Sequence, residues 1–177
     1  DQQVGVFAPL HINNYLSLLS EEIVYGKHVN RFPPKTARLF LAYNQFVVRS
    51  KIVKWRPDVA HETYYSRFSS APKFCPTVIT VYDMIHELFS DEMPLTDSTS
   101  ALKRIAVDRA DAVICISENT KQDLIRLYGT PASKISVVHL GFDQFLSQER
   151  LSLISDFSVS PFLLYVGQRA GYKNFTG

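Results

Sequence analysis

The chain has 177 residues, of which 46% are hydrophobic and 20% are charged, a composition typical of a soluble globular protein with one domain, or one domain and part of another. No apolar stretch approaches the ~20 residues that a membrane-spanning helix needs, and no signal peptide opens the chain. The two cysteines, Cys75 and Cys115, form no CxxC pattern, which argues against a disulfide framework and a zinc site. We therefore expect a cytoplasmic protein with reduced thiols.

The net charge of +2 hides an uneven distribution. The segment between Ile23 and Pro57, called the basic segment below, contains no acidic residue. It holds eight basic residues: Lys27, Arg31, Lys35, Arg38, Arg49, Lys51, Lys54 and Arg56. Such a segment predicts an anionic partner, which could be the headgroups of an anionic membrane surface, phosphates or nucleic acid. The alternative is a solvated helix face whose lysine stems cover apolar surface.

The first half of the chain predicts short strands at 4–10 and 58–63, with two helices between them. The first helix is expected over 13–24 and the second, longer one over 33–55. Apolar residues at helical spacing form a stripe on the longer helix, which we expect to face the core. This stripe consists of Leu39, Ala42, Tyr43, Phe46 and Val47, with Ile52 and Val53 as further candidates.

The second half alternates regularly between strands and helices. Apolar runs predict strands at 77–83, 111–117, 134–141 and 161–167, and a helix with Ala101, Leu102, Ile105 and Ala106 inward is expected over 98–110. A further helix begins after Ser117 as its N-cap and stops at Gly129, with Pro131 just beyond. Because the strands are continuously apolar, they predict a parallel sheet of the Rossmann-like α/β class with helices on both faces.

Known ligand-binding fingerprints are missing from the sequence. No strand is followed by GxGxxG, and neither the GxxxxGK[ST] phosphate loop nor a GxSxG nucleophile elbow occurs. No Asp-x-Asp pair is present to hold a divalent metal with a nucleotide. We therefore expect no metal and no cofactor, and we look for the site at the carboxyl ends of the strands, where parallel sheets gather ligands.

Asp83 and His86 follow the strand at 77–83 and stand three residues apart. On one helical turn they could face the same cleft, where a carboxylate and an imidazole could act as general base and orienting group or hydrogen-bond a sugar hydroxyl. The alternative is structural, with Asp83 as a helix N-cap and His86 as a packing residue.

Ser117 and Glu118 occupy a helix N-terminus after a buried strand. A hydroxyl and free amides there could hold an anion or a hydroxyl-rich ligand. Plain N-capping by Ser117 and a favourable dipole interaction of Glu118 explain the same residues without a ligand.

The sequence after Gly167 reads "QRAGYKNF" and carries Arg169 and Lys173 around Gly171. Two cations on a tight loop could converge on a diphosphate. Without a metal, such cations would stabilise the negative charge of a departing nucleoside diphosphate. The alternative is an ordinary basic turn.

Taken in order, "TVITVYDMIHELF", "DRADAVICISENTKQDLIRLYGTPASKISVVHLGFD" and "PFLLYVGQRAGYKNF" resemble the family 4 retaining glycosyltransferases, which have the GT-B fold. The resemblance runs from about Arg56 to Asn174. It implies one half of a two-domain protein that transfers a sugar from a nucleotide-sugar donor to a glycan or lipid-linked acceptor. The family's members retain the anomeric configuration and need no bound metal.

The resemblance assigns roles to single positions. Asp83 and His86 match the catalytic loop, and Arg169 and Lys173 match the loop that contacts the donor diphosphate. The acceptor side of the cleft would include Tyr82, Ser117, Glu118, Gly141 and Asp143. Two positions depart from the family, which often has His where this chain has Tyr82 and Asn where it has Leu140.

The resemblance also implies a domain organisation. Residues 1–147 would form the N-terminal Rossmann-like acceptor-binding domain, without the glycine-rich loop that the family carries near its first strand. Residues 148–160 would be a linker, and 161–177 the first strand and loop of a sugar-nucleotide-binding domain. The family's E-x-x-x-x-x-x-E motif is not found in the sequence, so we expect residues 1–177 alone to be inactive.

Two other functions are compatible with the sequence. The first is a non-catalytic Rossmann-type module that binds a sugar or a nucleotide. The second is a nucleic-acid binder that uses the basic segment. We expect no nucleic-acid partner, because the aromatic residues of that segment lie mostly at helical core spacing and not on an open stacking platform.

Overall fold

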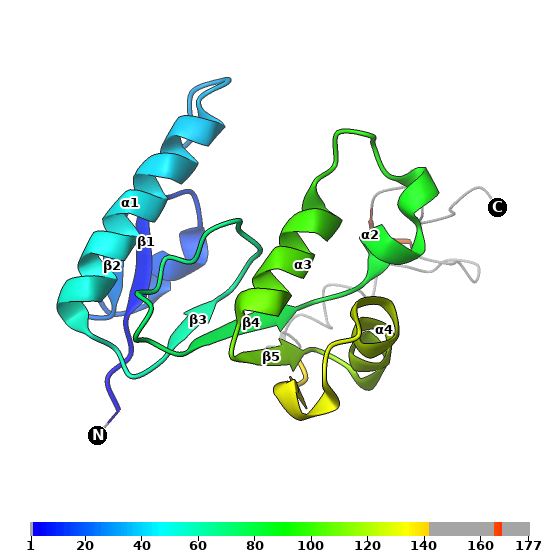
Figure 1. The fold of residues 1–177 in the computed structure, drawn as a ribbon. Helices are drawn as coiled ribbons and strands as arrows, with labels where there is room; N and C mark the ends of the chain where they lie inside the picture. The colour runs from blue at the N-terminus through cyan, green and yellow to red at the C-terminus, as the bar shows by residue number, and fades with distance from the viewer. Residues whose placement is uncertain (1, 142–164, 168–177) are drawn as a thin grey trace, which may run out of the picture.

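The computed structural model describes residues 2–141 and 165–167. Within them all strand pairings are parallel, and the strands form a two-stranded sheet, β1–β2, and a four-stranded sheet in the order β3-β4-β5-β6 (Figure 1). These sheets and their helices confirm the expected Rossmann-like parallel α/β fold. The expected linker at 148–160 lies outside the described residues, as do the first four residues of the strand expected at 161–167. Its last three residues are described and do not form a strand.

The N-terminal part contains β1 (Val6–His11), the 3-10 helix η1 (Asn14–Leu18), β2 (Val24–His28) and α1 (Ala37–Trp55). The helix predicted over 13–24 is wrong. Asn13 caps only the short η1, and the chain then enters β2, which pairs with β1 from Val24 onward. Pairing with β1 therefore overrides the weak helical spacing of this segment. At Gly26 a Cβ atom would overlap the carbonyl oxygen of Ala8, so the two strands approach closely only because this residue is glycine.

Helix α1 packs on β1 with a different face from the one predicted. Ile52 is buried, and the ring of Trp55 lies edge-on to Phe7 at 5.5 Å between ring centroids. In contrast, Leu39 is 72% exposed and Phe46 is 76% exposed. We call the exposed set the α1 apolar stripe: Leu39, Ala42, Tyr43, Phe46 and Val53. The expectation that the predicted stripe faces the core is wrong for these five residues and is confirmed for Ile52. The reason is that α1 carries apolar residues on both sides, and the side with Ile52 and Trp55 packs inward.

The four-stranded sheet consists of β3 (Ala60–Glu62), β4 (Thr77–Val81), β5 (Ala112–Cys115) and β6 (Ile135–Val137). Between β4 and β5 the chain forms α2 (Ile85–Leu88), the 3-10 helix η2 (Ser90–Glu92) and α3 (Thr99–Arg109). Between β5 and β6 it forms α4 (Glu118–Tyr128) and the 3-10 helix η3 (Ala132–Lys134). No helix of the described part is long and apolar enough to cross a membrane.

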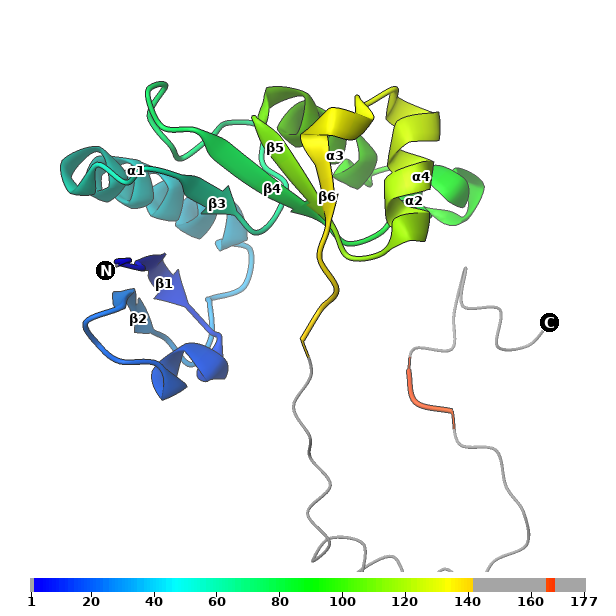
Figure 2. The ribbon, with the colours of Figure 1, turned by 90° about the horizontal axis from the view of Figure 1, so that it is seen from below.

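The main core lies between one face of this sheet and the helices α3 and α4 (Figure 2). Alternate residues of β4 and β5 point into it: Ile79, Val81, Val113 and Cys115. Helix α3 contributes Ala106 and Val107, and α4 contributes Leu124. The inward face predicted for α3 was partly wrong, because Ala101 and Ile105 are exposed and Lys103 is buried.

Candidate functional site

The loops after β4, β5 and β6 meet at one edge of the four-stranded sheet, which we call the carboxyl edge (Figure 2). They comprise residues 82–84, 116–118 and 138–141. The Thr120 hydroxyl donates a hydrogen bond of 3.4 Å to the Tyr82 carbonyl, and His139 Nδ1 lies 3.1 Å from the Ile116 carbonyl oxygen. These bonds join the three loops into one surface, which is where a parallel sheet is expected to bind its ligand.

Asp83 is held at this edge by its backbone as well as its side chain. Its Oδ1 accepts a 3.1 Å hydrogen bond from the Ile85 amide, and its carbonyl accepts one of 2.8 Å from Lys103 Nζ. The side chain remains partly exposed. One carboxylate oxygen therefore has no recorded partner among the described residues and could accept a hydrogen bond from a ligand hydroxyl.

Lys103 is a buried cation directly beneath the Asp83 loop. Its side chain is 1% exposed, and its ammonium group forms a 2.7 Å ion pair with Glu87 Oε2. It also lies 5.5 Å from the centroid of the Tyr65 ring. The other oxygen of Glu87 accepts a 2.6 Å hydrogen bond from the Tyr128 hydroxyl. Lys103, Glu87 and Tyr128 thus link α3, α2 and α4 to the backbone of Asp83.

The burial of this network changes how its members titrate. Burial opposes ionisation of Glu87, but the hydrogen bonds from Lys103 and Tyr128 outweigh it and hold the pKa of the carboxyl below its usual value. Burial, and then the bond to Glu87, raises the pKa of the Tyr128 hydroxyl. The network is therefore a fixed ion pair with a neutral tyrosine at neutral pH.

This network was not predicted from the sequence. The signal that could have revealed it is the position of Lys103, which stands in helical register with Val107 and Ala110 on the buried side of α3. A lysine in phase with core residues requires an anionic partner, and Glu87 is the acidic residue of the adjacent turn.

His86 is directed to a different partner from Asp83. Its Nε2 lies 3.2 Å from Asp97 Oδ2, while its Nδ1 is buried without a hydrogen-bond partner among the described residues. The Thr99 hydroxyl and amide, with a smaller effect of His86, lower the pKa of Asp97. A cavity of about 150 Å³ lies beside this pair. The described structure records no contact between the side chains of Asp83 and His86, so it does not bring the two together as a hydrogen-bonded pair.

Ser117 and Glu118 begin α4 at the centre of the carboxyl edge. The Ser117 hydroxyl accepts a 3.1 Å hydrogen bond from the Thr120 amide and lies 3.0 Å from its hydroxyl, which is the capping geometry. Glu118 is exposed and accepts a 2.8 Å bond from Gln122. Ser117 therefore has a complete structural role, and Glu118 points to a neighbour on its own helix.

The remaining expected site residues are only partly described. Gly141 is exposed at the end of the described segment, and a Cβ atom there would meet nothing within 4 Å. Asp143, Arg169 and Lys173 lie outside the described residues. Tyr82 follows β4 directly, and its amide donates a 3.4 Å hydrogen bond to the Tyr65 hydroxyl.

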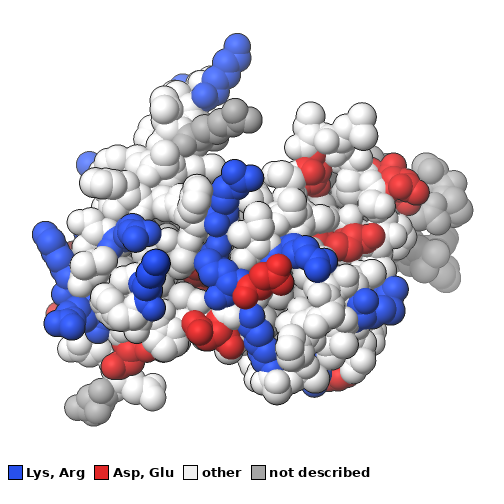
Figure 3. Space-filling view, in the orientation of Figure 1, with Lys and Arg blue, Asp and Glu red and all other residues white. Residues whose placement is uncertain are grey.

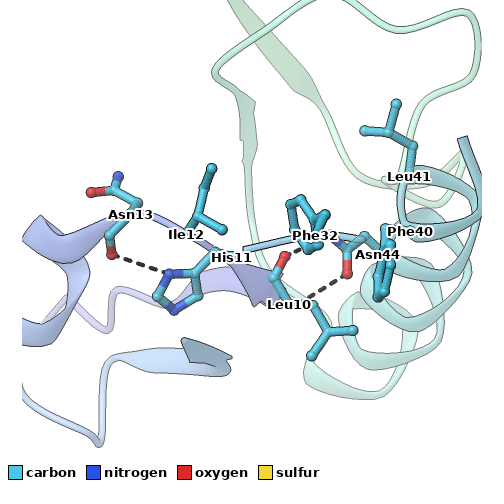
Figure 4. A pocket seen from close by; sticks show the side chains of 8 residues that line it. All are labelled: Leu10, His11, Ile12, Asn13, Phe32, Phe40, Leu41 and Asn44. Carbon is cyan, nitrogen blue, oxygen red and sulfur yellow. Dashed lines mark hydrogen bonds between the residues drawn. The ribbon is translucent and has the colours of Figure 1, made fainter. Parts of the chain in front are cut away.

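A larger cavity lies at the carboxyl end of β1, beside the first turns of α1 (Figure 4). Its volume is about 360 Å³, and we call it the β1 cavity. Its lining residues are Leu10, His11, Ile12, Asn13, Phe32, Phe40, Leu41 and Asn44. This cavity was not predicted from the sequence, because its walls come from three separate segments: the end of β1, the 29–36 connection and α1.

The basic segment comprises β2, α1 and the connections next to them. Seven of its eight basic residues have described side chains, and all seven are exposed: Lys27, Arg31, Lys35, Arg49, Lys51, Lys54 and Arg56. None of these seven forms an ion pair with a described acidic residue. On the face drawn in Figure 3, Lys and Arg side chains lie over both halves of the molecule, including the half that holds α1, and acidic side chains lie among them.

Metal-ligating residues do not cluster in the described ranges: no group of three or more His, Cys, Asp or Glu side chains there could hold a metal ion. Cys75 and Cys115 are both buried free thiols. Burial raises the pKa of Cys115 to about 11, so this thiol is protonated and unreactive at neutral pH.

Comparison with known proteins identifies one family. The family model described as Glycosyltransferase Family 4 matches residues 3–144, which include all the described strands and helices. No curated protein matches the sequence. Among solved structures, a glycosyltransferase from Rickettsia africae ESF-5 is similar at 18% sequence identity and a TM-score of 0.43. That match covers 81% of this chain and 38% of the Rickettsia chain.

Proposed function

Because the chain belongs to glycosyltransferase family 4, we propose that the protein transfers a glycosyl group from a nucleotide-sugar donor to a glycan or lipid-linked acceptor, with retention of configuration. The observation that carries this proposal is the match of the family model across residues 3–144. In the proposal, residues 1–147 supply the acceptor side of the active site. The donor side begins with the segment 161–177.

Asp83 is the proposed catalytic carboxylate. It stands at the carboxyl edge with one oxygen accepting from its own loop, which leaves the other for an acceptor hydroxyl. Because Lys103 binds the Asp83 carbonyl, the loop is preorganised and its carboxylate does not need to reorient for each turnover. His86, paired with Asp97 beside a small cavity, would bind the acceptor or donor sugar from the α2 side.

The other expected residues complete the proposed cleft. Ser117 and Glu118 would contribute the start of α4 to the cleft beside Tyr82, and Gly141 with Asp143 would form the turn that leads toward the second domain. Arg169 and Lys173 would bind the donor diphosphate. As the nucleoside diphosphate departs, these two cations would stabilise its negative charge, so the proposed reaction needs no metal ion.

We also propose that the protein binds the surface of an anionic membrane peripherally through α1. Two observations support this. The α1 apolar stripe is exposed, and the same helix carries Arg49 and Lys54, which form no ion pair with a described acidic residue. Large exposed apolar side chains together with basic residues on one helix are typical of a segment that lies in the headgroup region of a bilayer.

The direct test measures nucleoside diphosphate release by the full-length protein from a panel of UDP- and GDP-sugars, with an anionic lipid extract as acceptor source. We expect release from at least one donor, insensitive to EDTA. Substituting both Arg169→Ala and Lys173→Ala should reduce it at least 100-fold, a scale typical of lost charge stabilisation. Arg126→Ala, on the exposed last turn of α4, is the matched control and should have no effect.

Two results would overturn the proposal. Strict dependence on a divalent metal would contradict the metal-independent mechanism. Donor binding without any turnover would favour the alternative function, a non-catalytic module that binds sugars or nucleotides.

A further inference from the structure

We propose that the β1 cavity binds the hydrocarbon chain of an anionic, lipid-linked acceptor and that Arg31 and Lys35 bind the charged group at its mouth. This inference rests on the proposed function, since it names the class of acceptor that the transferase would use. It assigns to the acceptor a binding site that is separate from the carboxyl edge of the four-stranded sheet.

The interior of the cavity is apolar. Phe32 and Phe40 form one wall, with their ring centroids 4.7 Å apart, and Leu10, Ile12 and Leu41 line the rest (Figure 4). Leu41 is 68% exposed and Ile12 is 54% exposed, so apolar surface faces the opening without a described partner. The volume of about 360 Å³ lies in the range of ligand pockets, roughly 300–1,000 Å³.

Several polar side-chain atoms of the lining already have partners. The Asn44 side chain accepts a 3.0 Å hydrogen bond from the Leu10 amide and donates one of 2.8 Å to the Leu10 carbonyl. His11 Nδ1 lies 3.1 Å from the Asn13 carbonyl oxygen, and Asn13 Oδ1 accepts a 2.9 Å hydrogen bond from the Tyr15 amide. Since the other lining side chains are apolar, a hydrocarbon fits the cavity better than a sugar or a nucleobase does.

Three exposed cations adjoin the cavity lining along the chain or across the strand pair. Arg31 precedes the wall residue Phe32, Lys35 follows it on the same connection, and Lys27 is the register partner of Leu10. All three are exposed, and none has an ion pair with a described acidic residue.

The acidic residues closest in sequence to these cations lie at another end of the two-stranded sheet β1–β2. Glu21 and Glu22 precede β2 and therefore stand at its amino end, whereas the cavity is at the carboxyl end of β1. Because β1 and β2 are parallel, these ends are opposite. An apolar cavity whose lining adjoins exposed cations matches a hydrocarbon chain that ends in a phosphate or carboxylate.

Alkyl phosphates of increasing length are the probe. Isothermal titration calorimetry with the full-length protein, below the critical micelle concentrations, should show affinity rising about fourfold per added methylene until the cavity is filled. Dodecyl maltoside has the same chain without the charge and should bind at least tenfold more weakly than dodecyl phosphate. A flat response to chain length would overturn the proposal, as would equal binding of the two head groups.

Matched variants locate the binding. Leu41→Gln should weaken dodecyl phosphate binding roughly tenfold, because it removes a side chain that the ligand would cover. Leu18→Gln changes a leucine of η1 that is 80% exposed and does not line the cavity, and it should bind as the wild type does. The pair Arg31→Gln and Lys35→Gln should weaken dodecyl phosphate but not dodecyl maltoside. Equal behaviour of Leu41→Gln and Leu18→Gln would place the ligand elsewhere and overturn the inference.

Failure of the inference can be distinguished from failure of the proposed function. If nucleotide sugars are turned over but Leu41→Gln binds alkyl phosphates normally, the transferase stands and the cavity proposal falls. If the cavity binds alkyl phosphates with the expected dependence but no nucleotide sugar is consumed, the site stands as a lipid site. The acceptor role assigned to it then falls with the proposed function.

Discussion

Lys103 Nζ lies 2.7 Å from Glu87 Oε2 in a pair that is almost fully buried, and the same ammonium group binds the carbonyl of Asp83. The contact connects the stability of the domain to the geometry of its candidate catalytic loop. A buried charge pair of this kind is costly to break from one side, because the remaining charge cannot be hydrated.

Lys103→Met should therefore lower the free energy of unfolding by about 3–5 kcal/mol, measured by chemical denaturation. The double variant Lys103→Met with Glu87→Leu removes both charges and should recover much of that loss. Arg104→Met is the matched control, because Arg104 is the exposed neighbour and its pair with Asp108 lies in solvent. We expect it to cost less than about 1 kcal/mol. A Lys103→Met variant as stable as Arg104→Met would show that the pair does not stabilise the domain.

Glu87 should also make stability depend on pH. Its pKa is lower in the folded state than its unfolded value of about 4.3, so its contribution is complete above that value. The contribution is lost as the pH falls through the lower, folded pKa. Denaturation curves between pH 7 and pH 2 should show a decline in stability below about pH 4 that is shallower in Glu87→Gln. An identical decline in both proteins would contradict the assignment.

The cap of α4 provides a third test. Ser117→Ala removes the hydroxyl that accepts from the Thr120 amide and should cost about 1 kcal/mol of unfolding free energy. Ser133→Ala, in the exposed η3 turn, is the control and should change stability by less than about 0.5 kcal/mol. If Ser117→Ala were neutral to folding but impaired ligand binding, the serine would be a ligand contact more than a cap.

The α1 apolar stripe predicts membrane binding that can be measured by co-sedimentation with vesicles. Binding should require anionic lipid, because each exposed Lys or Arg contributes about 1 kcal/mol to the binding free energy near such a surface. It should weaken as the salt concentration rises, since salt screens this attraction. Phe46→Gln should reduce binding severalfold without destabilising the fold, since the ring is 76% exposed. Phe68→Gln changes a comparably exposed ring outside α1 and should not. If both variants bind vesicles equally, α1 is not the membrane contact.

The sequence predicted the four-stranded part of the fold well because its signals there are local. β-branched runs mark β4 and β5, and Ser117 and Gly129 bound α4 where the structure has its caps. Gly129 adopts φ 70°, the left-handed conformation that favours glycine at a helix C-terminus.

The parts that were not predicted depend on contacts between distant residues. β2 exists because Val24 and Tyr25 pair with β1, and no periodicity in 13–24 reveals that partner. The orientation of α1 is decided by Asn44 and Trp55 against β1, whereas the helix itself carries apolar residues on two sides. At the candidate site, Asp83 was found by its place after a strand. The group that fixes its backbone, Lys103, comes from a helix 20 residues later.

The most direct test of the account is the rate of glycosyl transfer by Asp83→Asn in the full-length protein, measured with a donor that the wild type uses. Asparagine keeps the size of the side chain and an oxygen for the Ile85 amide, so the loop should remain folded. Loss of a catalytic carboxylate should lower the rate about 10²- to 10⁴-fold at unchanged unfolding free energy. A variant that transfers sugar at the wild-type rate would contradict the claim that the carboxyl edge of β4 is the catalytic edge of this protein.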